Sequence, residues 1–134
     1  MDVQGKRRCW RCVEIGLWIG ACVCLATLPM LSLMPAQNLH RIGAGQPIDH
    51  FVAYAGTGLV MMLALRRPSL ATRIAAGLLL VGGGLELAQN FAPSRGPRLV
   101  DFLGSASGAL TGVLAGVLLC RALTAAHDLH RDWT

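Results

Sequence analysis

Four long apolar stretches alternate with short polar segments over most of the chain, and nearly all of the charged residues lie between these stretches. Each stretch is about as long as the roughly 20 residues that a helix needs to cross the hydrocarbon core of a bilayer. The pattern therefore predicts an all-α integral membrane protein, a bundle of four helices. The predicted spans cover residues 13–33, 48–65, 74–91 and 99–120 of one membrane domain, 13–120, between a basic tail over 1–12 and a second tail over 121–134.

Composition supports this class and excludes an ordinary soluble domain. Of the 134 residues, 54% are hydrophobic and only 14% are charged, whereas about 25% charged residues is typical of soluble domains. The net charge of +5 does not indicate nucleic acid as a partner, because the basic residues form no aromatic-interleaved patch.

The basic residues are divided unequally between the two sides of the predicted bundle. Most lie on the side of both termini and of the connection after the second span, and fewer lie on the other side. The first group is Lys6, Arg7, Arg8, Arg11, Arg66, Arg67, Arg73, Arg121 and Arg131; the second is Arg41, Arg95 and Arg98. Because cytoplasmic loops are enriched in Lys and Arg, we expect both termini in the cytoplasm.

Two further patterns leave alternatives open. Cys9 and Cys12 have the C-x-x-C spacing of redox and zinc sites, but no second ligand pair accompanies them, so a reduced tail without a metal is the simpler interpretation. Four glycines repeat every fourth residue of the last span: Gly104, Gly108, Gly112 and Gly116. Such a stripe lets helix backbones approach closely. It serves either packing within the chain, which a four-helix chain favours, or an oligomer.

Polar side chains inside the spans gather toward the side opposite the termini. Glu86, Gln89 and Asn90 end the third span at a spacing of three and four residues, which places them on one helical face. The second span begins with Asp49 and His50, with Tyr54 one turn further, and the fourth begins with Asp101 and Ser105. A carboxylate in hydrocarbon is costly unless it is paired or hydrated, so an intramembrane acid indicates a functional site.

These residues predict an outward-facing pocket. Glu86 and His50 are the candidates for moving a proton, and Arg95, in the connection after the third span, is the candidate for holding an anion. Gln89, Asp101, Asp49, Tyr54 and Ser105 are candidates for binding or orienting a head group.

Simpler interpretations exist for several of these residues. Asp49 and Asp101 suit a role at helix N-termini, Glu86 suits a structural ion pair with Arg95 or Arg98, and Gln89 and Asn90 suit hydrogen bonds between helices. The sequence predicts no metal and no cofactor. No nucleotide-binding loop is present, and His40 and His50 lack an H-x-x-x-H or C-x-x-C companion.

The same residues resemble the VanZ-like family of small bacterial membrane proteins. The matching motifs are Asp49-His50-Phe51-Val52-Ala53-Tyr54, then Glu86-Leu87-Ala88-Gln89, then Pro93-Ser94-Arg95, then Asp101 with Gly108 and Gly112, between about Pro47 and Gly116. Two positions depart from the family's pattern: Ser105 replaces an Asn, and Gln46-Pro47 replaces an Asp-Lys pair. The resemblance implies a multi-pass protein of the bacterial inner membrane and a link to resistance to the glycopeptide teicoplanin. It implies no particular reaction.

Three functions fit these observations. The first is an enzyme or binding protein for membrane lipid or a lipid-linked cell-wall precursor, in which the polar pocket holds the head group. The second is a non-enzymatic accessory or scaffold protein whose polar network is structural. The third is a small proton-coupled exporter in which Glu86 titrates. It is the weakest, because the cytoplasmic halves of the spans offer no polar path.

Overall fold

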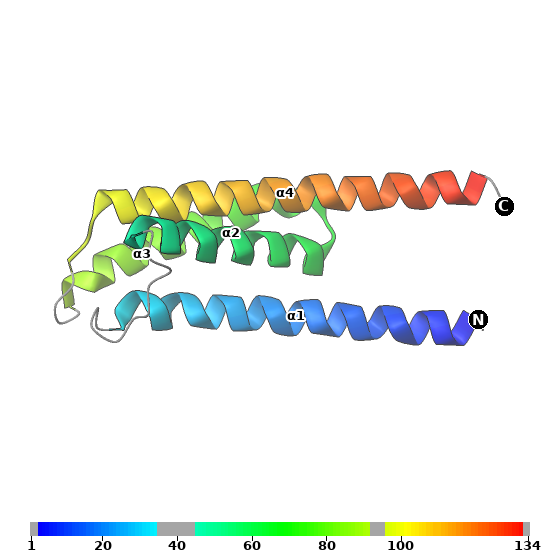
Figure 1. Ribbon diagram of the computed structural model, residues 1–134, viewed down its shortest axis with the longest axis horizontal. Helices are drawn as coiled ribbons and strands as arrows, with labels where there is room; N and C mark the ends of the chain where they lie inside the picture. The colour runs from blue at the N-terminus through cyan, green and yellow to red at the C-terminus, as the bar shows by residue number, and fades with distance from the viewer. Residues whose placement is uncertain (1–2, 35–44, 92–95, 133–134) are drawn as a thin grey trace.

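The computed structural model describes residues 3–34, 45–91 and 96–132, and these form an antiparallel arrangement of four long helices (Figure 1). The helices are α1 (Val3–Leu33), α2 (Gln46–Leu65), α3 (Ala71–Ala88) and α4 (Leu99–Asp132), with short 3₁₀ turns η2 (Pro68–Leu70) and η3 (Gln89–Phe91). No strand occurs in the described ranges. Each of the four helical segments is long and apolar enough to cross a membrane. The predicted all-α fold, with four helices long and apolar enough to span a membrane, is therefore confirmed.

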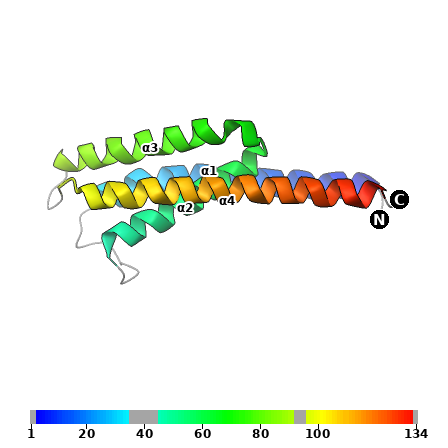
Figure 2. The ribbon, with the colours of Figure 1, turned by 90° about the horizontal axis from the view of Figure 1, so that it is seen from above.

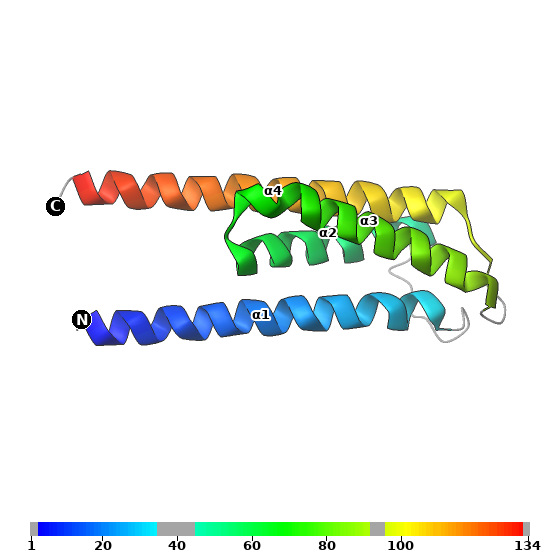
Figure 3. The same cartoon turned by 180° about the vertical axis from the view of Figure 1, so that it is seen from behind.

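The two ends of the bundle differ in what they carry. The start of α1, the end of α4 and the turn between α2 and α3 lie at one end, which we call the terminal end (Figures 1 and 3). The opposite end, where α1 and α3 finish and α2 and α4 begin, is called the loop end. At the terminal end α1 and α4 extend past the other two helices. Many of the residues predicted to form tails, in 1–12 and 121–134, are therefore helical.

The turn between α2 and α3 follows from its sequence. Pro68 disfavours helical geometry for the residue before it, and Arg67 is accordingly extended, with φ −123° and ψ 92°. Arg66 ends α2 in the left-handed conformation, with φ 52°, and its backbone N–H donates to the Met62 carbonyl. The chain thus reverses within a few residues, which brings α3 back along the bundle.

The most extensive contact in the fold joins α2 to α4, and the glycine stripe produces it. A Cβ atom at Gly104, Gly108 or Gly112 would overlap the backbone of α2 at Pro47, Phe51 and Ala55, respectively, and one at Gly116 would overlap Met62. These glycines therefore let α4 lie directly on the α2 backbone. The stripe serves packing within the chain, and a second copy could use it only if α2 moved away.

The core lies where α2 and α4 meet parts of α1 and α3. Its buried members are Leu28, Tyr54, Met62, Ile74, Leu78, Ala109 and Val113. Viewed from above, α2 and α3 lie on opposite sides of α4 (Figure 2). Many leucines, such as Leu80, Leu99 and Leu118, remain exposed on the outside, which suits helices surrounded by lipid.

Candidate functional site

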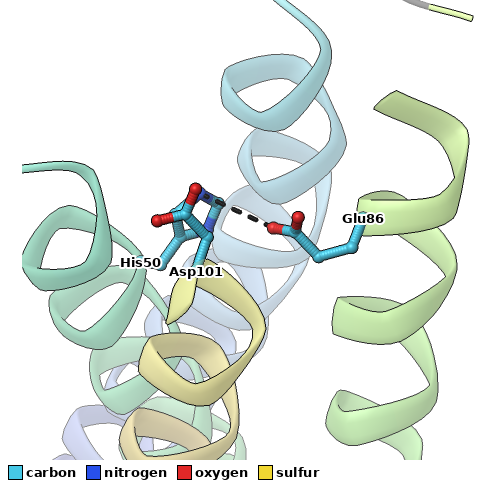
Figure 4. A group of neighbouring side chains, drawn as sticks. All are labelled: His50, Glu86 and Asp101. Carbon is cyan, nitrogen blue, oxygen red and sulfur yellow. Dashed lines mark ion pairs between the residues drawn. The ribbon is translucent and has the colours of Figure 1, made fainter. Parts of the chain in front are cut away.

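Three helices bring one ionisable side chain each to the same point at the loop end. His50 comes from the first turns of α2, Glu86 from the last turn of α3, and Asp101 from the first turn of α4. Figure 4 shows the carboxylate of Glu86 directed across a short gap toward the His50 ring, with the Asp101 carboxylate beside that ring. We call these three residues the triad. One potential ligand atom from each lies within 4.8 Å of the others.

The distances within the triad are longer than direct hydrogen bonds. His50 Nε2 lies 4.0 Å from Glu86 Oε1, beyond the 2.7–3.2 Å or so of an N–H···O hydrogen bond. Glu86 is buried, with 5% of its surface exposed, and Asp101 is fully buried. The arrangement therefore places two buried carboxylates and one imidazole in a low-dielectric environment.

The far sides of His50 and Glu86 are held by other groups. Ser105 Oγ lies 3.3 Å from His50 Nδ1, so the second ring nitrogen is left to face Glu86. The backbone N–H of Arg98 donates to Glu86 Oε2 at 3.2 Å. The Arg98 side chain is exposed and forms no ion pair with Glu86, so the predicted Glu86–Arg98 pair exists only as this backbone contact.

Asp101 differs from the other two members because neither of its carboxylate oxygens has a hydrogen-bond partner among the described residues. It lies in the first turn of α4, where the helix dipole favours an acid, but it accepts no capping hydrogen bond. Asp49 Oδ1 is likewise buried and unpartnered within the described ranges, and Gly45 rather than Asp49 is the N-cap of α2.

Gln89 lies beside the triad but binds a different helix. It is fully buried, and its amide nitrogen donates to Ser32 Oγ on α1 at 3.0 Å. Asn90 is exposed and donates to the Leu87 carbonyl. The prediction that Asn90 shares the face of Glu86 and Gln89 is wrong, because the chain tightens into a 3₁₀ turn at Gln89–Phe91 and turns Asn90 outward.

Tyr54 lies one turn below His50, and it is buried with 3% of its surface exposed. Gly82 gives it room. A Cβ atom there would lie 3.5 Å from the Tyr54 hydroxyl and 3.3 Å from the Ser105 Cβ. Tyr54 of α2 and Ser105 of α4 therefore lie against α3 at Gly82, each one helical turn from a member of the triad. Arg95, the predicted anion-binding residue, lies outside the described residues.

An apolar groove of about 1000 Å³ runs between α3 and α4, and Glu86 is the member of the triad that lines it. Its walls are mainly leucines and glycines, with Phe102 and Pro97, and its polar end is formed by Glu86 and Arg98. Leu80, Leu87 and Leu99 line it and are each more than half exposed. The groove thus opens toward the surroundings of the helices and closes on a buried carboxylate.

The fold and the site define a multi-pass membrane protein with a buried polar cluster at one end of a four-helix bundle. Comparisons of the chain with family models, with curated protein sequences and with solved structures gave no match. The resemblance to the VanZ-like family stays a prediction that rests on the motifs themselves.

Two features of the site could not be read from the sequence. Ser32, the partner of Gln89, is a lone hydroxyl near the end of an apolar helix, and no motif marks its position. The convergence of His50, Glu86 and Asp101 as potential metal ligands was missed as well, because the three residues lie on separate helices without the short spacing of sequence-local metal motifs.

Proposed function

We propose that this protein binds a lipid with a phosphate-bearing head group, with the lipid chain in the groove between α3 and α4 and the head group at the polar end of the groove. The groove itself is the observation that supports this proposal. It is apolar along the helices and has a carboxylate and an exposed guanidinium, those of Glu86 and Arg98, at one end. An amphipathic ligand is the class that matches both parts.

The charges at the polar end suit an anionic head group. Arg98 is exposed at the mouth of the groove, and guanidinium groups bind phosphate through several N–H donors. Glu86 and His50 lie behind it, and a carboxylate with an imidazole can take up and release a proton. The substrates in question are membrane lipids and lipid-linked cell-wall precursors, and the chemistry on the head group would be proton transfer by these two side chains.

The orientation and the family are part of the same proposal. We place the protein in the bacterial inner membrane as a VanZ-like protein, with both termini in the cytoplasm and the loop end outside. Arg66, Arg67 and Arg73 lie at or near the turn between α2 and α3, on the side of the termini, which is the arrangement that the positive-inside rule favours. The link to teicoplanin resistance follows from the family resemblance and would act through a cell-wall precursor.

Lipid retention tests the proposal. The full-length protein is purified in mild detergent, and its co-purified lipids are identified by native mass spectrometry. Gly84 lines the groove, and no atom lies within 4 Å of the position that a Cβ would take there, so Gly84→Trp is chosen to place a large side chain in the groove. Gly77 is equally open but lies outside this groove, which makes Gly77→Trp the matched control.

We expect the wild type and Gly77→Trp to retain a phosphate-bearing lipid and Gly84→Trp to lose it. Arg98→Ala should retain less of the anionic lipids than the wild type. The same lipid complement in Gly84→Trp as in the wild type would contradict the proposal.

A structural role is the second candidate, and one observation favours it. The bonds Gln89–Ser32 and Ser105–His50 each join two elements, η3 to α1 and α4 to α2. In a scaffold protein these bonds would hold the bundle and nothing more. Gln89→Leu would then lower the amount of folded protein, and no lipid would be retained by the wild type.

A further inference from the structure

We propose that the triad of His50, Glu86 and Asp101 binds a divalent transition-metal ion, with Zn²⁺ as the best fit. The proposal rests on the convergence of one potential ligand atom from each of three helices within 4.8 Å. It is supported by three further features: the unpartnered Asp101, the charge of the buried cluster, and the groups that hold the far sides of the ligands.

The surroundings of Asp101 are by themselves an indication of a bound ion. Its side chain is fully buried, neither carboxylate oxygen has a partner among the described residues, and its carboxylate lies beside the His50 ring (Figure 4). Buried polar groups in proteins are hydrogen-bonded, and buried charges are paired or coordinate metals. A cation between the three side chains would satisfy this carboxylate directly.

The charges of the site balance with a divalent ion. Glu86 and Asp101 contribute two carboxylates that are at most 5% exposed, and the imidazole of His50 is neutral when it binds a metal. Two carboxylates, one neutral imidazole and one divalent cation form a unit without net charge. Such a unit is the form of this cluster that costs least to bury in a low-dielectric interior.

The geometry needs only a small adjustment. Donors about 2.0–2.2 Å from a tetrahedral zinc ion stand roughly 3.3–3.6 Å apart. The 4.0 Å between His50 Nε2 and Glu86 Oε1 is too long for a hydrogen bond and close to this value. Side-chain rotations that move the donor atoms by about 1 Å would close the triad around an ion at ordinary metal–ligand distances.

The other atoms of the ligands are already held, as they are in most metal sites. Ser105 Oγ lies 3.3 Å from His50 Nδ1, which turns Nε2 toward Glu86. The Arg98 N–H binds Glu86 Oε2, which leaves Oε1 for the ion. Ser105 is therefore a positioning residue for His50.

The donor set selects the class of metal. One imidazole with two carboxylates suits Zn²⁺ and related transition metals, whereas Mg²⁺ prefers six oxygen ligands and keeps several waters. Three protein ligands leave a fourth zinc position for water or a substrate oxygen, which is the arrangement of catalytic rather than structural zinc sites. Metal binding does not depend on the proposed lipid function, because it requires only these three side chains.

Metal titration of the full-length protein in detergent tests the proposal. Competing ligands elsewhere are removed first by Cys9→Ser, Cys12→Ser, His127→Ala and His130→Ala. The protein is then stripped with chelator and titrated with Zn²⁺ by calorimetry, and with Co²⁺, whose d–d absorption reports the coordination geometry. Mg²⁺ serves as the comparison ion.

We expect one Zn²⁺ per chain, tetrahedral Co²⁺ absorption and no competition from Mg²⁺. Asp101→Asn and His50→Ala should each weaken Zn²⁺ binding by more than about 100-fold, and Ser105→Ala by about 10- to 100-fold, the range found for groups that orient metal ligands. Glu14→Gln removes an exposed acid in the half of α1 that lies toward the terminal end, away from the triad. This variant should leave the Zn²⁺ affinity unchanged.

Zn²⁺ affinity in Asp101→Asn equal to that of the parent protein, or no binding by the parent protein, would overturn the proposal. Circular dichroism establishes that each variant is folded. If Asp101→Asn does not fold, His50→Ala decides, because an unchanged affinity in that variant is equally incompatible with a site at His50. The titration uses no lipid, and Gly84→Trp leaves the triad intact, so the metal and lipid proposals can fail separately.

Discussion

Asp101 lies in the first turn of α4 with no exposed surface and with both carboxylate oxygens unpartnered among the described residues. The helix dipole stabilises an acid in this position by only about 0.3–1 kcal/mol. An unsatisfied buried polar group costs about 1–3 kcal/mol, and a charged one costs more. Without a cation, the carboxylate is therefore expected to destabilise the fold that it belongs to.

The stability of Asp101→Asn follows from this balance. We expect the variant to raise the free energy of unfolding of the chelator-treated protein by about 1–3 kcal/mol, because a charge is removed from a buried site. Added Zn²⁺ should shift this difference in favour of the wild type, since at about 100 times its Kd a ligand stabilises the wild type by about 2.7 kcal/mol. Thermal unfolding in detergent, without and with Zn²⁺, measures the stability of Asp101→Asn relative to the wild type, and Glu14→Gln serves as the control. A metal-free Asp101→Asn protein less stable than the metal-free wild type would contradict the prediction.

At the scale of single residues, the sequence located the polar side chains but not their partners. The spacing of Glu86 and His50 from the ends of their spans placed both near the loop end. It could not show that Glu86 meets the backbone N–H of Arg98 instead of its guanidinium. The hydrogen bond from Gln89 to Ser32 joins positions 57 residues apart, and such a contact depends on how α1 packs, which periodicity does not determine.

At the scale of helices, α2 and α4 form the most closely packed pair in the described part of the molecule. Their backbones meet along the glycine stripe, where no side chain separates them. The other helices contact this pair less extensively. Motion of α3 relative to α4 would therefore change the groove without disturbing the α2–α4 contact.

Substitutions in the glycine stripe test the close backbone contact between α2 and α4. Gly108→Ala would place a Cβ against the carbonyl oxygen of Phe51, and we expect a loss of about 1–3 kcal/mol of stability from overpacking. Gly56→Ala, on an exposed part of α2 with no atom within 4 Å of the added carbon, should be close to neutral. Unfolding midpoints in detergent compare the two, and equal stability would mean that α2 and α4 are not in backbone contact.

The repeat of glycines along the last span was readable from the sequence, because a four-residue period marks one face of a helix. The partner of that face was not. The sequence favoured packing within the chain, and the structure places the stripe against α2, which precedes α4 by two connections. The groove between α3 and α4 was not predicted, since it arises from how far these helices separate rather than from any residue pattern.

At the scale of the whole molecule, the triad lies at the end of the bundle opposite the cluster of basic residues in the turn between α2 and α3. The triad lies at the loop end, and Arg66, Arg67 and Arg73 lie toward the terminal end. The proposed orientation turns the triad and the mouth of the groove away from the cytoplasm. A ligand would then reach the site from the outer leaflet.

Labelling of single cysteines tests the orientation. In a variant without the native cysteines, Gly96→Cys introduces a thiol at the loop end and Ser69→Cys one in the turn at the terminal end; both positions are exposed. We expect a membrane-impermeant maleimide to label Gly96→Cys in intact spheroplasts and Ser69→Cys only after lysis, because the basic end stays in the cytoplasm. The reverse pattern would invert the proposed topology.

The contact between α2 and α4 has a consequence for biosynthesis. α4, whose backbone covers α2, is synthesised after both α2 and α3, so α2 enters the bilayer before its main neighbour is made. Until then the face of α2 that later meets the glycine stripe can contact only lipid or an insertion factor, and His50 lacks Asp101 as a neighbour. Ribosome stalling before Leu99 should therefore yield an intermediate that membrane proteases recognise, and synthesis of α4 should end that sensitivity.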